Sequence, residues 1–114
     1  VIVMGHKISD VDSIGAGIGI YRAAKSLNKR AHIVVNNPTM SVRPIIDSFR
    51  QNSDYDEHMF IDSEEASELV DNNTVVVVVD TNKPSYTECP EILKKTDFIR
   101  LSSAADSFEA KTEF

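Results

Sequence analysis

The chain has 114 residues, of which 41% are hydrophobic and 26% are charged, a composition typical of a folded domain and not of a disordered segment. Its formal net charge of −6 argues against a protein that binds nucleic acid through a broad basic face. The longest apolar run, residues 75–79, is far short of the roughly 18 residues that a membrane span needs, and the single cysteine excludes a disulfide framework or a multi-cysteine zinc site.

Hydrophobic periodicity predicts four strands that alternate with three helices. Short apolar runs are typical of buried strands, and apolar residues that recur every three to five positions are typical of helices. Local signals support the helices, because Asn28 closes the first, Pro44 suits the first turn of the second and Asp62 caps the third. In chain order, we expect a strand at 1–4, a helix at 11–27, a strand at 31–35, a helix at 42–51, a strand at 58–61, a helix from 62 that ends before 71, and a strand at 75–79.

This alternation predicts an α/β fold with a Rossmann-like parallel sheet and helices on both of its faces. The strand at 75–79 is apolar on both faces, as strands of a sheet covered on both sides usually are. In such sheets, ligands bind beyond the carboxyl ends of the strands. The residues directly after Met4 and Val79 are therefore the first place to look for chemistry.

Four potential metal ligands follow the first and last of these strands. His6, Asp10 and Asp12 lie within seven residues, in a loop and the first turn of a helix, where free N–H groups and the helix dipole favour negative charge. Asp80 follows residues 75–79, and we expect it at the same edge of the sheet, where a carboxylate can bridge two metal ions. Mixed imidazole and carboxylate ligation suits manganese or a similar divalent ion, and such ions would supply the positive field that an anionic substrate needs.

Each of these four residues also has a purely structural interpretation. Asp12 could be the N-cap of the helix, Asp10 a turn residue, Asp80 a strand-terminating carboxylate and His6 a solvated loop histidine. Their placement after the carboxyl ends of two strands favours the metal site. The remaining candidates are expected to be solvated or structural: the loop at 54–58, His32, Glu64, Glu65 and Glu68.

Two segments carry a resemblance to a known family. The first, Gly5-His6-x-x-x-Asp10-x-Asp12-x-x-Gly15-Ala16, resembles the first motif of the DHH phosphoesterase superfamily, which includes family II inorganic pyrophosphatases, exonucleases and oligoribonucleases. The second, residues 77–91, closely resembles the second motif and the following loop of the GdpP-type cyclic-di-AMP phosphodiesterases. The first motif does not separate the subfamilies, whereas the loop after Asp80 does most of that separation.

The resemblance implies a manganese-dependent phosphodiesterase that opens cyclic-di-AMP to the linear dinucleotide pApA by a two-metal mechanism. It implies that His6, Asp10 and Asp80 bind one Mn²⁺ ion and that Asp12 and Asp80 bind the other, so that Asp80 is the bridge. Asp12 and Asp80 are then the catalytic carboxylates. The expected partner is a cyclic dinucleotide and not duplex nucleic acid, and a homodimer is a possible assembly.

The resemblance also sets expectations for the surroundings of this segment. Residues 1–114 would form the N-terminal part of a DHH domain, with the DHH-associated substrate domain beyond Phe114. The third motif of the family, Asp-His-His followed by Arg, is expected between Ile99 and Arg100, and the sequence does not contain it there. In full-length relatives this domain is cytoplasmic and belongs to a membrane-anchored bacterial protein, although this segment itself is not expected to contact the membrane.

Two other functions stay open on the sequence alone. One is an oligoribonuclease, a pAp phosphatase or a pyrophosphatase on the same metal scaffold. The other is a non-catalytic module that senses a nucleotide or a metal through a degenerate site. The absent Asp-His-His triplet supports the second alternative, and it predicts that the chain as it stands is inactive.

Overall fold

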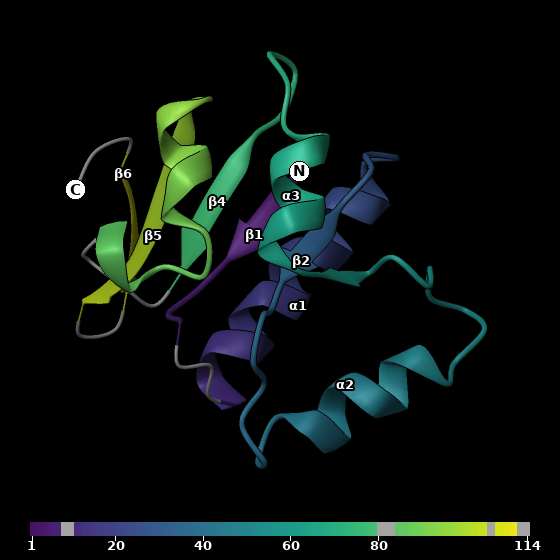
Figure 1. The fold of residues 1–114 in the computed structure, drawn as a ribbon. Helices are drawn as coiled ribbons and strands as arrows, with labels where there is room; N and C mark the ends of the chain where they lie inside the picture. Colours follow the sequence, from purple (N-terminus) through teal and green to yellow (C-terminus); the bar gives the residue numbers. More distant parts are fainter. Residues whose placement is uncertain (8–10, 80–83, 105–106, 112–114) are drawn as a thin grey trace.

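The fold is known from a computed structural model, which describes residues 1–7, 11–79, 84–104 and 107–111 (Figure 1). Six strands form one sheet in the order β3-β2-β1-β4-β5-β6. The first five are mutually parallel, and the last pairs antiparallel with its neighbour. The strands are β1 (Ile2–Met4), β2 (His32–Val34), β3 (Phe60–Ile61), β4 (Val76–Val79), β5 (Phe98–Ala104) and β6 (Ser107–Lys111). The predicted parallel α/β sheet is confirmed.

The predicted helices are also present, and local sequence explains where they begin and end. They are α1 (Val11–Ser26), α2 (Arg43–Arg50) and α3 (Ser63–Leu69). Asn28 adopts the left-handed conformation, with φ of 60°, just after α1 ends. Asp62 caps α3 by accepting a 2.8 Å hydrogen bond from the backbone N–H of Glu65, whose side chain completes a capping box. No helix in the described ranges has both the length and the apolarity to cross a bilayer.

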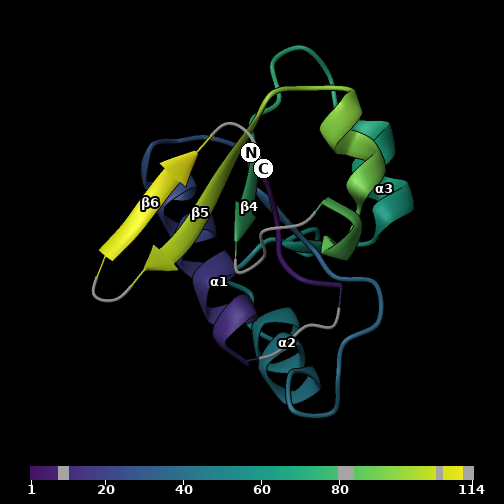
Figure 2. The ribbon, with the colours of Figure 1, turned by 90° about the vertical axis from the view of Figure 1, so that its left-hand side faces the viewer.

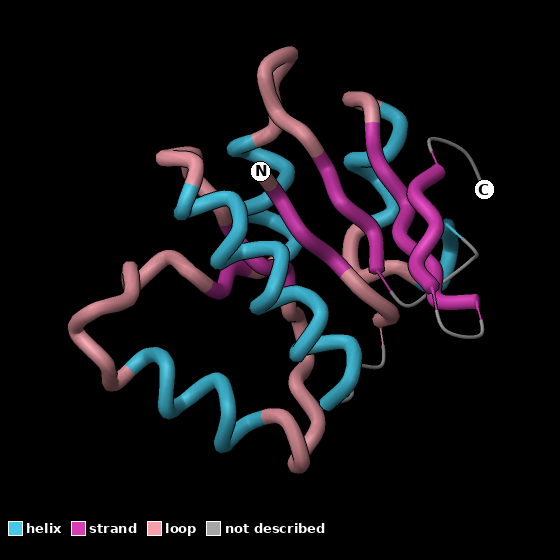
Figure 3. The backbone as a smooth tube through the Cα atoms, turned by 180° about the vertical axis from the view of Figure 1, so that it is seen from behind, coloured by secondary structure: helices cyan, strands magenta, loops and turns pink. Residues whose placement is uncertain are grey.

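Helices cover both faces of the sheet, because alternate residues of the central strands point to opposite sides. Val3 and Val77 face a core that contains apolar residues of α1 and α2. Met4 and Val78 face a second core, with residues of α3 and of the short 3₁₀ helix η2 (Pro90–Lys94). Figure 2 shows α1 and α3 on opposite sides of the strands, and Figure 3 shows α1 lying across the sheet.

The β5–β6 hairpin was not expected from the sequence. β5 runs parallel to β4 and crosses the Ile99–Arg100 junction as one uninterrupted strand, with Ile99 opposite Val77. β5 has the sequence Phe98-Ile99-Arg100-Leu101-Ser102-Ser103-Ala104, in which Arg100 and two serines interrupt the apolar run by which buried strands are recognised. That the family's third motif would normally stand at this junction stays a prediction from the resemblance.

Candidate functional site

The ends of three neighbouring parallel strands bring the predicted site segments to one edge of the sheet. β1 lies between β2 and β4, with Met4 opposite both Val34 and Val78. His6 therefore follows a strand that adjoins the one preceding Asp80, as the sequence analysis expected. Asp80 itself, like Asp10, lies outside the described residues.

A tight contact at Gly5 joins these segments. A Cβ atom on Gly5 would overlap the Oγ of Ser13 and would lie 3.4 Å from the carbonyl oxygen of Val79. No described glycine has a positive φ, so it is the close approach of the Ser13 hydroxyl, and not the backbone conformation, that favours glycine at position 5. Ser13 follows Asp12 in the sequence, and Val79 precedes Asp80. The backbone next to His6 therefore packs against the neighbours of both predicted catalytic carboxylates.

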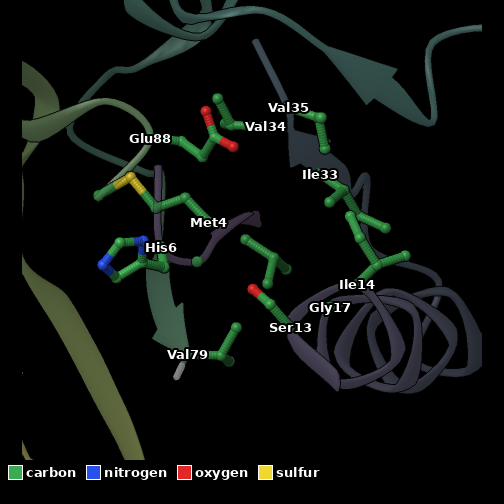
Figure 4. Close-up of a pocket in the computed structure, with 12 residues that line it drawn as sticks. Met4, His6, Ser13, Ile14, Gly17, Ile33, Val34, Val35, Val79 and Glu88 are labelled. Carbon is green, nitrogen blue, oxygen red and sulfur yellow. The ribbon is translucent and has the colours of Figure 1, made fainter. Parts of the chain in front are cut away.

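His6 is half-buried, and a second segment fixes its backbone. His6 and Thr87 form an antiparallel pair, and the N–H of Glu88 donates a 3.0 Å hydrogen bond to the carbonyl oxygen of Gly5. The rings of His6 and Tyr86 lie 5.4 Å apart and are inclined by 50°. Figure 4 shows the His6 ring directed away from α1. The loop after Asp80 therefore returns to the end of β1 and holds the histidine in place.

Asp12 lies in the first turn of α1 with its side chain exposed. The helix begins at Val11, so Asp12 is inside the helix and is not its N-cap. The positive end of the helix dipole stabilises a carboxylate at this position. The N-cap interpretation of Asp12 is thereby set aside.

Glu88 is a buried carboxylate at this edge that the sequence analysis did not single out. Its side chain is only 6% exposed, and burial raises the pKa of its carboxyl group to about 7, although hydrogen bonds from Asn36 oppose the shift. Its Oε2 accepts hydrogen bonds from the backbone N–H (3.2 Å) and the side-chain Nδ2 (3.0 Å) of Asn36. The only sequence signal was its place in the loop after Asp80, where a glutamate is ordinarily solvated.

The weaker candidates from the sequence have the roles that were expected of them. The loop at 54–58 lies before β3, and its charged residues are exposed. The Nδ1 atom of His32 lies 2.7 Å from the carbonyl oxygen of His58, which is a structural contact between β2 and that loop. Glu64 and Glu68 are exposed on α3.

The donor chemistry of the described residues suits a divalent cation, although the described part does not make a complete site. His6 and Asp12 supply an imidazole and a carboxylate near the ends of β1 and the start of α1. Within the described ranges, no three His, Cys, Asp or Glu side chains lie together as a metal-binding group. Asp10 and Asp80, the other two predicted ligands, fall outside those ranges, so the predicted ligand set stays a prediction.

Comparison with known proteins gives consistent similarities. Residues 1–101 match the family model described as DHH family, N-terminal domain. The chain is 41% identical over 103 residues to the cyclic-di-AMP phosphodiesterase GdpP of Bacillus subtilis, a match that covers 87% of the chain and 15% of that protein. It is 32% identical over 95 residues to the cyclic-di-AMP phosphodiesterase PdeA of Listeria monocytogenes, covering 82% of the chain and 14% of that protein. The chain therefore spans about one seventh of the length of these relatives.

Proposed function

This chain belongs to the DHH family, and we propose that it carries the first metal-binding half of an active site that hydrolyses cyclic-di-AMP to pApA. The substrate comes from the names of the similar proteins and from the resemblance of the loop after Asp80. The observation that carries the proposal is the contact of Gly5 with Ser13 and Val79. It gathers the segments that bear His6, Asp12 and Asp80 at the carboxyl edge of a parallel sheet, where such folds bind ligands.

In this proposal, His6, Asp10 and Asp80 would hold one manganese ion, and Asp12 and Asp80 would hold a second. When bound, such a pair of ions lowers the pKa of the attacking water and stabilises negative charge on the phosphoryl oxygens. The chain's own contribution is to fix the donors. The pairing with Thr87 orients the backbone of His6, and the first turn of α1 presents the Asp12 carboxylate to solvent and substrate.

The same edge also accounts for how an acidic chain can accept an anionic substrate. The net charge of −6 would repel a phosphodiester if the carboxylates stood alone. Bound cations reverse the local sign of the potential. The divalent ion should therefore be required for binding of the substrate as well as for its hydrolysis.

The test is turnover of several substrates by the natural full-length protein with excess Mn²⁺. Cyclic-di-AMP, a short RNA and inorganic pyrophosphate are incubated separately, and the products are separated by chromatography. The proposal expects conversion of cyclic-di-AMP to pApA in preference to the other two. Preferred cleavage of the RNA or pyrophosphate would assign the chain to another branch of the family.

One observation favours a second candidate, a non-catalytic module that senses a nucleotide or a metal. The sequence passes from Ile99 to Arg100 without the Asp-His-His triplet of the family, and β5 spans this junction as a regular strand. A site without that triplet lacks ligands. Binding of cyclic-di-AMP without hydrolysis by the natural full-length protein would identify the sensing role.

A further inference from the structure

Glu88 is tied by its backbone to the segment that carries His6. Its N–H donates to the carbonyl oxygen of Gly5 at 3.0 Å, and the residue before it, Thr87, forms the antiparallel pair with His6. Thr87 is 1% exposed, so this pairing is inside the protein. A displacement of Glu88 would therefore move the backbone on which the His6 imidazole is mounted.

Glu88 is also tied to the ends of two further elements. Its carbonyl oxygen accepts hydrogen bonds from Asn36 Nδ2 at 2.8 Å and from Ser63 Oγ at 2.9 Å. The backbone N–H of Ser63 donates to Asn36 Oδ1 at 2.8 Å, which closes the network. Asn36 follows β2, and Ser63 begins α3. Glu88 thus connects the edge of the sheet at β1 and β2 to the start of a helix on one face.

One oxygen of the Glu88 carboxylate takes no part in this network. Oε2 accepts from Asn36, but Oε1 is buried and has no hydrogen-bond donor in the part of the chain that the structure describes. A buried acceptor without a donor lowers stability, more so if it is charged, so its retention needs an explanation.

The surroundings of Glu88 offer that explanation. It lines a cavity of about 10 Å³ together with His6 and Ser13, the residue after Asp12. Figure 4 shows Glu88 and Ser13 reaching into this space from opposite sides. Its volume is close to what one water molecule requires. The Glu88 side chain therefore lines a small space between the segments that carry His6 and Asp12.

We propose that Glu88 is a positioning residue of the metal site, which fixes the His6 segment through its backbone and whose Oε1 accepts a hydrogen bond from a water in this cavity. This inference rests on the proposed function, since it assumes the metal site that His6 and Asp12 contribute to. Outer-shell acceptors orient metal ligands, and their loss typically weakens metal binding by about 10–100-fold. Asn36 has a supporting role, because its two donors hold Oε2 and so fix the carboxylate.

The experiment is a Mn²⁺ titration of the 114-residue chain, followed by the electron paramagnetic resonance signal of the free ion. Glu88→Gln keeps the length of the side chain and an oxygen for Asn36, but it places an N–H₂ group where Oε1 was. Its dissociation constant for Mn²⁺ should rise by about 10-fold or more. Glu68→Gln removes an equal charge from an exposed position on α3, and its affinity should match the unchanged chain.

Two further measurements separate this role from a merely structural one. A thermal melt without metal at pH 7 or above should show Glu88→Gln at least as stable as the unchanged chain, because glutamine places no charge at this buried position. Asn36→Ala alters an exposed residue and leaves the carboxylate in place, and it should weaken Mn²⁺ binding several-fold. This second variant tests the inference even if Glu88→Gln fails to fold.

The outcomes of these experiments distinguish failure of the positioning role of Glu88 from failure of the proposed metal site. If the chain binds Mn²⁺ and both Glu88→Gln and Asn36→Ala bind it equally well, the positioning role is overturned. If the unchanged chain and Glu68→Gln bind no Mn²⁺ at all, the proposed metal site fails, and the role of Glu88 fails with it.

Discussion

The backbone of Gly5 lies so close to the side chain of Ser13 that a Cβ atom on Gly5 would overlap the Ser13 Oγ. This relationship joins the end of β1 to the first turn of α1, and it places the His6 segment beside the turn that holds Asp12. The same Cβ atom would lie 3.4 Å from the carbonyl oxygen of Val79. The geometry of the candidate site therefore depends on the absence of a side chain at this residue.

Gly5→Ala should destabilise the chain by about 1–3 kcal/mol, because the added methyl group must displace Ser13 or the strand end. It should also weaken Mn²⁺ binding, since the shift separates His6 from the first turn of α1. Chemical denaturation with urea measures the first effect.

Gly19→Ala is the matched control: nothing lies within 4 Å of a Cβ there, and the change should stabilise α1 by up to about 1 kcal/mol. Equal stability of the two variants would show that the Gly5 contact is unimportant.

Glu88 should make stability depend on pH. Its carboxyl group has a pKa of about 7 in the folded chain against an ordinary value of 4.5, because burial disfavours the charged form. The unfolded chain therefore ionises first. The contribution of Glu88 is fully present below about pH 4.5 and is lost as pH rises to about 7, by at most about 3 kcal/mol in total.

The measurement is a series of urea titrations between pH 4 and pH 8 without divalent metal. The free energy of unfolding of the unchanged chain should fall relative to that of Glu88→Gln across this window, because glutamine cannot ionise. The difference should level off above pH 7. Two curves that run parallel from pH 4 to pH 8 would contradict the burial of an ionisable Glu88.

Asp80→Asn should abolish hydrolysis of cyclic-di-AMP by the natural full-length protein while the fold survives. Asp80 is proposed to touch both ions, and an amide lacks the charge that allows two cations to lie about 3.5–4 Å apart. The stability of the metal-free protein should change little or rise, since carboxylate repulsion is relieved. Hydrolysis with excess Mn²⁺ and a thermal melt give the two readouts. A folded variant with near-normal turnover would reduce Asp80 to a strand-end carboxylate.

The sequence was sufficient to predict the parallel sheet, its order of elements and the edge at which chemistry is expected. Each of these depends on short-range patterns: the apolar run at 75–79, the end signal at Asn28 and the cap at Asp62, all of which the structure bears out. The general rule for parallel sheets predicted that β1 and β4 end at the same edge. Their pairing brings the segment after Met4 beside the end of β4 at Val79.

The sequence could not reveal features that depend on long-range contact. Glu88 is buried because the loop returns to Gly5 and Asn36, and a glutamate in a polar loop carries no local sign of burial. The preference for glycine at position 5 likewise comes from the hydroxyl of Ser13, which is separated from it by a loop. β5 escaped prediction because Arg100 interrupts its apolar residues and two serines follow, although Arg100 is only 8% exposed.

The most direct test of the proposed metal centre is a Mn²⁺ titration of the 114-residue chain beside a variant that carries both His6→Gln and Asp12→Asn. With four ligands present and the Asp-His-His triplet absent, the unchanged chain should show one dominant weak site and little or no binding of a second ion, because the number of ligands sets the affinity. The double variant should lose that site while keeping its thermal melt. Binding of Mn²⁺ by the double variant with the affinity of the unchanged chain would contradict the placement of the metal centre at this edge of the sheet.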